Sequence, residues 1–144
     1  MQPPLNSALP KPLRILIVDD DDVFAGSLAA ILSGDPRLEV VDRAANGAKG
    51  LTLAIDERPD VVVLDVNMPI LDGFAVGRLI RMQMPDVRIV IVSGSPESEY
   101  LAEARRAGAD VYLRKDCGFD VLEEALIAEE LGALGETPAV VTAG

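Results

Sequence analysis

The stretch VVVLDVNMPILDGF, residues Val61–Phe74, begins with four apolar residues in a row and places an acid, Asp65, directly after them. An unbroken run of Val and Leu is typical of a strand that is covered on both faces, as in the middle of a parallel sheet. In such sheets, ligands bind beyond the carboxyl ends of the strands. Asp65 therefore stands where a ligand is expected, and the ends of the other strands indicate its chemistry.

Four further apolar runs are rich in Val, Ile and Leu and are nearly continuous. They are Leu13–Val18, Leu38–Val41, Arg88–Val92 and Val111–Leu113. A segment with apolar residues at helical spacing follows each of the five runs; these segments include Phe24, Leu51, Val76, Leu101 and Leu122. This alternation predicts an α/β fold, a doubly wound five-stranded parallel sheet with helices on both faces. Gly108 marks the expected end of the fourth helix.

Polar side chains follow four of the five predicted strands. The acids Asp19–Asp22 follow the first strand, Asp65 the third, Ser93 the fourth and Lys115 the fifth. Parallel strands end at one edge of a sheet, so we expect these side chains to share a cleft. Two carboxylates about 4 Å apart repel by about 4 kcal/mol at an effective dielectric constant of about 20, so the cluster needs a cation or a proton. Oxygen ligands without Cys or His favour a hard ion such as Mg²⁺.

The same side chains fit phosphoryl transfer to a carboxylate. An aspartate can attack phosphorus and form an acyl phosphate, while a metal ion and a lysine neutralise the transferred oxygens and a hydroxyl donates a hydrogen bond. Each residue alone has a simpler interpretation. The acid run fits a helix start, Asp65 a turn, Ser93 a turn or helix cap, and Lys115 a solvated surface lysine. The agreement of four strand ends favours the shared chemistry.

The overall composition disfavours several other functions. The chain has 24 acidic and 13 basic residues and a formal net charge of −11, so we expect no binding to nucleic acid or anionic membranes. It contains no apolar run long enough for a transmembrane span and no signal peptide. Cys117 is the single cysteine, which favours a reducing compartment, the cytoplasm. The 144 residues contain no histidine, so histidine phosphorylation cannot occur on this chain.

Four stretches together resemble the response-regulator receiver family, the phosphoacceptor half of two-component signalling. They are ILIVDDD (Ile15–Asp21), VVVLDVNMPILDGF (Val61–Phe74), IVIVSGS (Ile89–Ser95) and AGADVYLRK (Ala107–Lys115). The resemblance implies a flavodoxin-like (βα)5 fold with strand order 2-1-3-4-5. It implies a receiver domain over residues 13–134, between a Pro-rich tail at 1–12 and a short tail at 135–144. The sequence is most similar to receivers that carry a helix-turn-helix output domain, so the chain is interpreted as a stand-alone or truncated receiver.

The resemblance also implies a role for each strand-end residue. Asp19 and Asp20 match the acidic pair that holds Mg²⁺, with Asp20 as the more direct ligand. Asp65 matches the phosphorylated aspartate, and Asn67 would supply a backbone carbonyl to the metal. Lys115 matches the lysine that contacts the phosphoryl group. By the same analogy, Asn67 and Ser95 would tune the rate at which the phosphoryl group is lost.

A second set of implied roles concerns the response to phosphorylation. Ser93 matches the hydroxyl residue that turns toward the phosphoryl group, and Tyr112 matches the switch aromatic, whose simpler interpretation is a half-buried strand residue. The phosphoryl donor would be a sensor histidine kinase or a histidine phosphotransfer protein. The output would be a downstream protein or a self-dimer. Many receivers have proline after the lysine; Asp116 stands there in this chain, so we expect a trans bond.

Two other interpretations compete with this one. The segment Asp19-x-Asp21, together with Ser93, also fits a haloacid-dehalogenase-like phosphatase with Asp19 as the nucleophile. That family needs a further acidic pair at the end of a later strand, and nothing after Lys115 provides it. The second alternative is an interaction module that has lost phosphorylation, although every matched position is intact. A receiver would catalyse only its own phosphorylation and dephosphorylation.

Overall fold

The computed structural model describes residues 11–68, 71–94 and 100–128. In chain order, the elements are β1 (Leu13–Val18), α2 (Asp22–Ser33), β2 (Leu38–Ala44), α3 (Gly47–Glu57), β3 (Val61–Asp65), α4 (Gly73–Gln83), β4 (Arg88–Ser93), α5 (Tyr100–Arg106), β5 (Val111–Arg114), the 3-10 helix η1 (Lys115–Cys117) and α6 (Phe119–Ile127). Of the predicted tails, only residues 11 and 12 are among the described residues. Ser95 also lies outside them.

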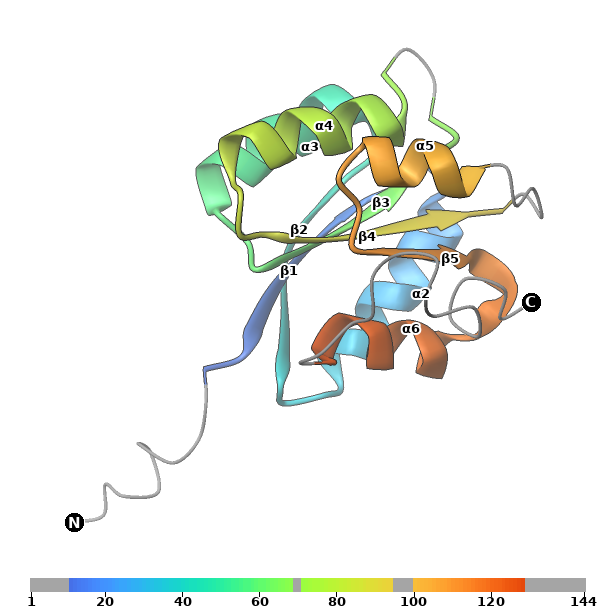
Figure 1. Ribbon diagram of the computed structural model, residues 1–144. Helices are drawn as coiled ribbons and strands as arrows, with labels where there is room; N and C mark the ends of the chain where they lie inside the picture. The colour runs from blue at the N-terminus through green and yellow to red at the C-terminus, as the bar shows by residue number, and fades with distance from the viewer. Residues whose placement is uncertain (1–10, 69–70, 95–99, 129–144) are drawn as a thin grey trace.

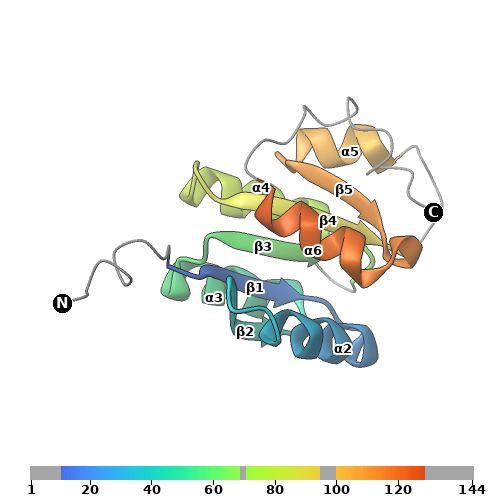
Figure 2. The same ribbon diagram turned by 90° about the horizontal axis from the view of Figure 1, so that it is seen from below.

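The five strands form one parallel sheet in the order β2-β1-β3-β4-β5, which confirms the predicted fold. Helices α3, α4 and α5 cover one face of the sheet, and α2 and α6 cover the other (Figure 1; Figure 2 shows the sheet from the side of α2 and α6). Because the chain reverses its direction of winding between β1 and β3, a crevice is expected at the carboxyl ends of these strands.

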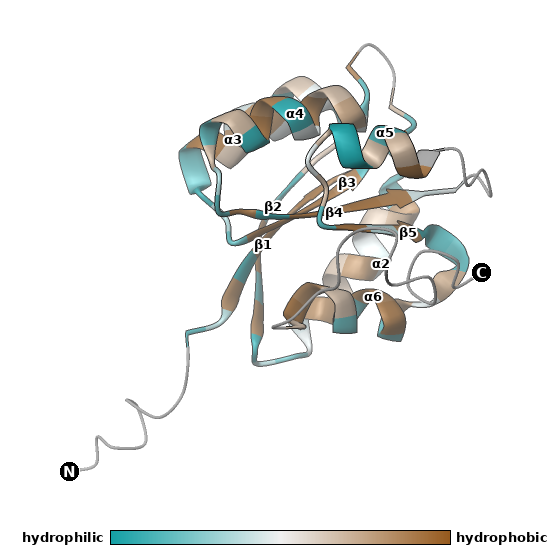
Figure 3. Cartoon of the chain, in the orientation of Figure 1, coloured by the Kyte–Doolittle hydropathy of each residue, from teal (hydrophilic) through white to brown (hydrophobic). Residues whose placement is uncertain are grey.

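Each face of the sheet has its own apolar core, because the central strands are buried on both sides. Ile15 and Ile17 of β1 point toward α2 and α6, whereas Leu16 and Val18 point toward α3 and α4. Figure 3 shows the central strands as an almost unbroken hydrophobic band between helices of mixed hydropathy. The near-continuous apolar runs thus reflect burial on two faces.

Carboxylate or amide oxygens cap the starts of α2, α3 and α4. Asp21 caps α2 by accepting a hydrogen bond from the backbone N–H of Phe24, which confirms the helix-start interpretation of this acid. Asp22, in the first turn, forms an ion pair with Arg43 of β2 at 2.7 Å. Two of the four consecutive acids after β1 are therefore structural, and the other two are left for the strand-end cleft.

The structure differs from the expectation in two elements. Strand β2 continues past Val41 to Ala44, with Val41 as an extra residue at a bulge opposite Ile15 and Leu16. This extension is polar because β2 is an edge strand with solvent-facing positions. The 3-10 helix η1 was not predicted, and the bond between Lys115 and Asp116 in it is trans, as expected.

Two further expectations concern single residues and membrane insertion. Gly108 has a φ of +81° just after α5, which agrees with a glycine at the end of that helix. In the described ranges, no helix is long and apolar enough to cross a membrane.

Candidate functional site

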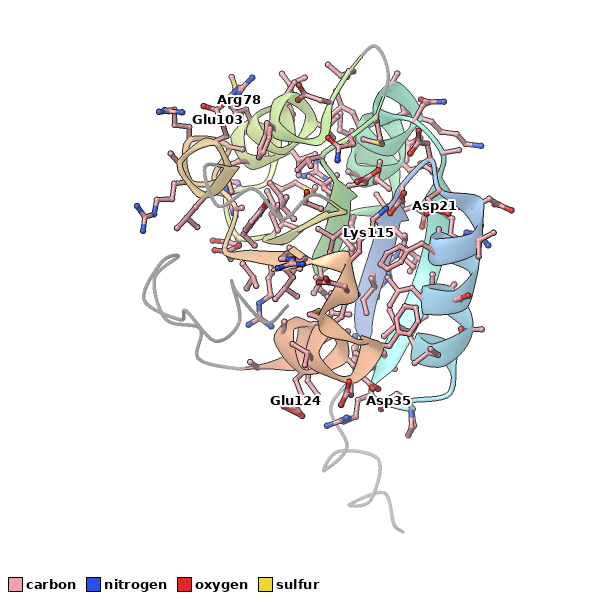
Figure 4. All side chains as sticks on the ribbon, turned by 90° about the vertical axis from the view of Figure 1, so that its right-hand side faces the viewer. Asp21, Asp35, Arg78, Glu103, Lys115 and Glu124 are labelled. Carbon is pink, nitrogen blue, oxygen red and sulfur yellow. The ribbon has the colours of Figure 1, made fainter. Side chains whose placement is uncertain are left out.

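Three predicted residues from different strands meet at the carboxyl edge of the sheet. The Lys115 Nζ lies 2.9 Å from Asp19 Oδ2 and 3.6 Å from Asp65 Oδ1. Asp19 follows β1, Asp65 ends β3 and Lys115 follows β5, so the sheet topology brings together residues that are far apart in the chain. Figure 4 looks onto this edge and shows Lys115 close to the start of α2, where Asp21 lies.

Burial dominates the electrostatics of the two aspartates. Asp19 and Asp65 are 3% and 2% exposed, and Lys115 supplies the nearby positive charge. Burial, followed by repulsion from Asp19, raises the pKa of Asp65 from an ordinary value of 3.8 to about 6, although Lys115 and the Asn67 N–H act in the opposite direction. One lysine thus compensates only part of the charge of two buried carboxylates.

Asp19 retains an oxygen atom without a hydrogen bond. Its Oδ1 accepts from the backbone N–H of Asp21 at 2.8 Å and from Lys115 at 3.2 Å. Its buried Oδ2 is closer to the ammonium, at 2.9 Å, but accepts no hydrogen bond of acceptable geometry from the described residues. The contact with Lys115 is therefore an ion pair without a hydrogen bond, and this oxygen keeps a lone pair for a further cation.

The acids are suited to a hard divalent cation. Carboxylate oxygens of Asp19, Asp20 and Asp65 lie within 4.8 Å of one another; Asp20 is exposed, and the other two acids are buried. The free Oδ2 of Asp19 and the surplus negative charge point to the same kind of ligand. Oxygen donors select Mg²⁺ or a similar ion over softer metals. The donor set therefore fits the predicted magnesium ion.

The loop after β3 is held close to Asp65. The backbone N–H of Asn67 donates to Asp65 Oδ1 at 3.3 Å, while the Asn67 side chain is exposed. Gly73 passes so close that a Cβ built on it would lie 2.1 Å from the Asp65 carbonyl oxygen. Only a residue without a side chain fits at this position, and the close approach orients the backbone around the acid.

Ser93 and Tyr112 lie on adjacent strands at the side of α4 and α5. Ser93 is fully buried, two residues after Ile91 and therefore on the same face of β4. Tyr112 pairs with Ile91 in the sheet and is 1% exposed. The simpler expectation of a half-buried strand aromatic is wrong, because Ala104 and Ala107, in and just after α5, belong to the same core and leave room for a large ring.

An aromatic contact to Lys115 was missed in the sequence. The Lys115 Nζ lies 4.6 Å from the centroid of the Phe24 ring, which the periodicity had assigned only to the apolar stripe of α2. Its position three residues after Asp21, in the first helical turn beyond the strand end, is the signal that could have placed it beside the cleft.

Comparisons with known proteins give one consistent result. The sequence pattern of the family described as Response regulator receiver domain matches residues 15–127. Transcriptional regulatory protein LnrK from Bacillus subtilis is 31% identical over 122 residues, which cover 85% of this chain and 56% of LnrK. Protein-glutamate methylesterase/protein-glutamine glutaminase 2 from Methanospirillum hungatei is 37% identical over 126 residues, which cover 85% of this chain and 36% of that enzyme.

A solved structure supports the fold and contains a phosphorylated aspartate. It is a response regulator protein from Burkholderia pseudomallei, described with a phosphorylated aspartic acid, a calcium ion and citrate. It matches with a TM-score of 0.75 and 28% identity, over 88% of this chain and 71% of that one. The two curated relatives are longer: this chain spans about half the length of LnrK and about a third of the methylesterase.

Proposed function

Since this chain belongs to the response regulator receiver domain family, we propose that Asp65 is its phosphoacceptor and that the domain acts as a phosphate-controlled switch. The observation that carries the proposal is the environment of Asp65. It is a buried carboxylate at the end of the central strand β3, 3.6 Å from Lys115 and next to a second buried acid, Asp19, whose Oδ2 accepts no hydrogen bond from the described residues. The Burkholderia relative, with its phosphorylated aspartate, supports the same chemistry.

In the transfer step, an Asp65 carboxylate oxygen attacks the phosphorus of a phosphohistidine. The new O–P bond forms as the N–P bond breaks, and the imidazole nitrogen leaves with the electron pair and takes up a proton. The pKa of Asp65 is about 6, so at higher pH the carboxylate is ionised and therefore nucleophilic. Lys115 faces the transferred oxygens with its ammonium, and the Ser93 hydroxyl donates to one of them. These 144 residues contain no histidine, so the phosphohistidine lies outside them, on a kinase or phosphotransfer protein.

The ligands of the cation would be Asp19, Asp20, Asp65 and the backbone carbonyl of Asn67. When bound, Mg²⁺ supplies charge neutralisation for the phosphoryl oxygens. Asp19 is oriented for this by the Asp21 N–H and Lys115, and Asp65 by the Asn67 N–H. Hydrolysis of the acyl phosphate resets the switch, and Asn67 together with Ser95, which lies outside the described residues, would tune its rate.

The output is carried by other proteins or by other parts of a longer chain. Relatives of the receiver include both a transcriptional regulator and an enzyme, so the family alone leaves the output open. For this chain we propose no catalysis beyond its own phosphorylation and dephosphorylation, action in the cytoplasm, and a protein partner or self-dimer. The acidic charge disfavours direct DNA binding by these residues.

The phosphatase alternative receives no support from the comparisons. Its nucleophile would be Asp19, but that residue is paired with Lys115 and accepts from the Asp21 N–H. The described chain after β5 also lacks a second acidic pair in the cleft, since Lys115 and η1 occupy that strand end.

The first experiment tests the phosphoacceptor. Incubation with a small acyl phosphate and Mg²⁺ should add one phosphoryl group, because positioning and electrostatics provide the catalysis. Intact-mass spectrometry should detect this adduct in the wild type and lose it in Asp65→Asn. An adduct that persists in Asp65→Asn, or that maps to Asp19, would contradict the proposal.

The second experiment tests the cation site. Titration calorimetry with Mg²⁺ should show weaker binding in Asp20→Ala than in the wild type. Asp22→Ala is the matched control, since it removes a nearby exposed acid that pairs with Arg43 instead of joining the cluster. Equal losses in both variants would indicate a general charge effect and would count against the assigned ligand.

A further inference from the structure

Lys115 has an aromatic neighbour as well as its two carboxylate neighbours. The Nζ lies 4.6 Å from the centroid of the Phe24 ring. The Phe24 ring in turn packs on Phe119, with ring centroids 5.7 Å apart and an interplanar angle of 30°. An ammonium over an aromatic face is attracted by the ring quadrupole. Lys115 therefore lies between a negatively charged cleft and an aromatic pair.

The position of Phe24 is set by the start of α2. Its backbone N–H donates to the capping side chain of Asp21 at 3.1 Å, and Asp21 in turn donates its own N–H to Asp19. Two hydrogen bonds, from Phe24 to Asp21 and from Asp21 to Asp19, thus link the backbone of Phe24 to the cluster of acids. Phe24 is half-buried, so its ring is partly exposed to solvent and packs against the edge of the buried core.

The position of Phe119 depends on the turn after β5. The 3-10 helix η1 begins at Lys115, and Gly118 follows it with a φ of +98°, a conformation that favours glycine. This turn brings Phe119, the first residue of α6, onto Phe24. The aromatic pair therefore joins the segment that carries Lys115 to the helix that starts beside Asp19.

We propose that Phe24 is a positioning residue that acts through Lys115. A lysine side chain is flexible and presents a single compact charge. The Phe24 ring confines the ammonium to the side of the cleft where it meets Asp19 and Asp65. During phosphorylation the ammonium then needs only a short movement from Asp19 to the incoming oxygens. This role rests on the proposed function of Asp65 and Lys115.

The kinetic test compares Phe24→Leu with the wild type. At saturating Mg²⁺, the rate constant for phosphorylation of Asp65 by a small acyl phosphate, followed by intact mass, should fall about three- to tenfold. Phe24→Tyr keeps an aromatic face and should retain most of the rate. Phe119→Leu is the matched control, because it changes the same aromatic pair without removing the ring under Lys115, and it should cost less than Phe24→Leu.

A double-mutant cycle separates positioning from general structural damage. If Phe24 acts through Lys115, Phe24→Leu should change the rate little when Lys115→Ala is already present. Equal losses in both backgrounds, or no loss in Phe24→Leu alone, would overturn the positioning role while leaving Asp65 as the acceptor. No adduct in the wild type would overturn the proposed function and this role with it.

A measurement without phosphorylation tests the contact itself. Protons above an aromatic ring resonate upfield, so the Lys115 ε-methylene signal should lie upfield of those of the exposed Lys11 and Lys49. In metal-free protein, this difference in chemical shift should disappear in Phe24→Leu and persist in Phe24→Tyr. An unshifted Lys115 signal in the wild type would contradict the geometry and overturn the proposal.

Discussion

Asp65 combines two properties at the scale of the residue. It must be ionised to attack phosphorus, and it is buried beside Asp19, which opposes ionisation and raises its pKa to about 6. Lys115 offsets part of this cost from 3.6 Å away. A divalent cation would offset more of it, so the same charges that destabilise the empty site favour a bound cation.

The first prediction concerns stability against pH in the presence of EDTA. The pKa of Asp65 is higher in the folded protein than in the unfolded chain, so its contribution is favourable at low pH and is lost as the pH rises through about 6. Asp65→Asn should therefore stabilise the metal-free protein at pH 7.5, by up to about 3 kcal/mol. Denaturant unfolding should show that this gain shrinks as the pH falls to 4.5. A gain that is independent of pH would contradict the electrostatic cause.

The second prediction concerns Lys115→Arg. The ammonium reaches both Asp19 and Asp65 as a compact charge, whereas a guanidinium is broad and planar and does not fit the same position. We expect a loss of about tenfold in affinity for beryllofluoride, a phosphoryl mimic, in the presence of Mg²⁺; this corresponds to about 1.4 kcal/mol. Titration followed by NMR measures it. Lys49→Arg, on the exposed surface of α3, is the control, and equal affinities in the two variants would contradict a specific role.

At the scale of the element, the loop between β3 and α4 positions the backbone around Asp65. Gly73, the first residue of α4, packs against the backbone of Asp65 at the end of β3. Because glycine has no side chain, the two segments can come into van der Waals contact. Asp72 caps α4 by accepting from the Ala75 N–H, which fixes the helix at this point. The close approach is therefore built from a cap and a glycine.

The third prediction tests this approach with Gly73→Ala. The new Cβ would lie 2.1 Å from the Asp65 carbonyl oxygen, a backbone atom, so α4 must move. We expect a loss of at least about 2 kcal/mol in the free energy of unfolding, together with weaker Mg²⁺ binding. Gly26→Ala in α2 is the control, since its Cβ would come no closer than 3.7 Å to a neighbour, and it should gain about 0.5–1 kcal/mol. Similar effects of both changes in urea unfolding would contradict the steric cause.

At the scale of the whole molecule, phosphorylation has to change a surface away from Asp65. Ser93 ends β4 beside Asp65, and Tyr112 lies on β5 under α5 in a fully buried position. The Tyr112 side chain already points inward in this structure, since it is buried beneath the α5 side of the sheet. We therefore propose that Ser93 stabilises this arrangement when it donates to a phosphoryl oxygen, and that the face of α5, β5 and α6 responds.

The fourth prediction is a change at that face that depends on both residues. With beryllofluoride and Mg²⁺, wild-type amide resonances of β5 and α5 should shift, because the mimic biases a two-state surface. Ser93→Ala should still bind the mimic and show smaller shifts in these elements. Tyr112→Phe, which keeps the packing volume, tests the hydroxyl separately. If all three proteins show the same shifts, the signal leaves Asp65 by another route.

The fold and most of the site could be predicted from the sequence by itself. Near-continuous apolar runs separated by helical stripes are local patterns, and parallel topology then places every strand end on one edge. Asp19, Asp65 and Lys115 could therefore be assigned to a common cleft without any distance. The same local chemistry identified Asp21 as a helix-start acid.

Only the tertiary structure determined which of these residues contact one another. The ion pair between Lys115 and Asp19 joins residues 96 positions apart, and no local pattern encodes which of several acids a lysine will contact. Burial of Tyr112 depends on the small residues of α5 above it, and the contact of Lys115 with Phe24 depends on the turn through η1. Such contacts arise from the packing of separate elements, whereas periodicity reports only the face that each element buries.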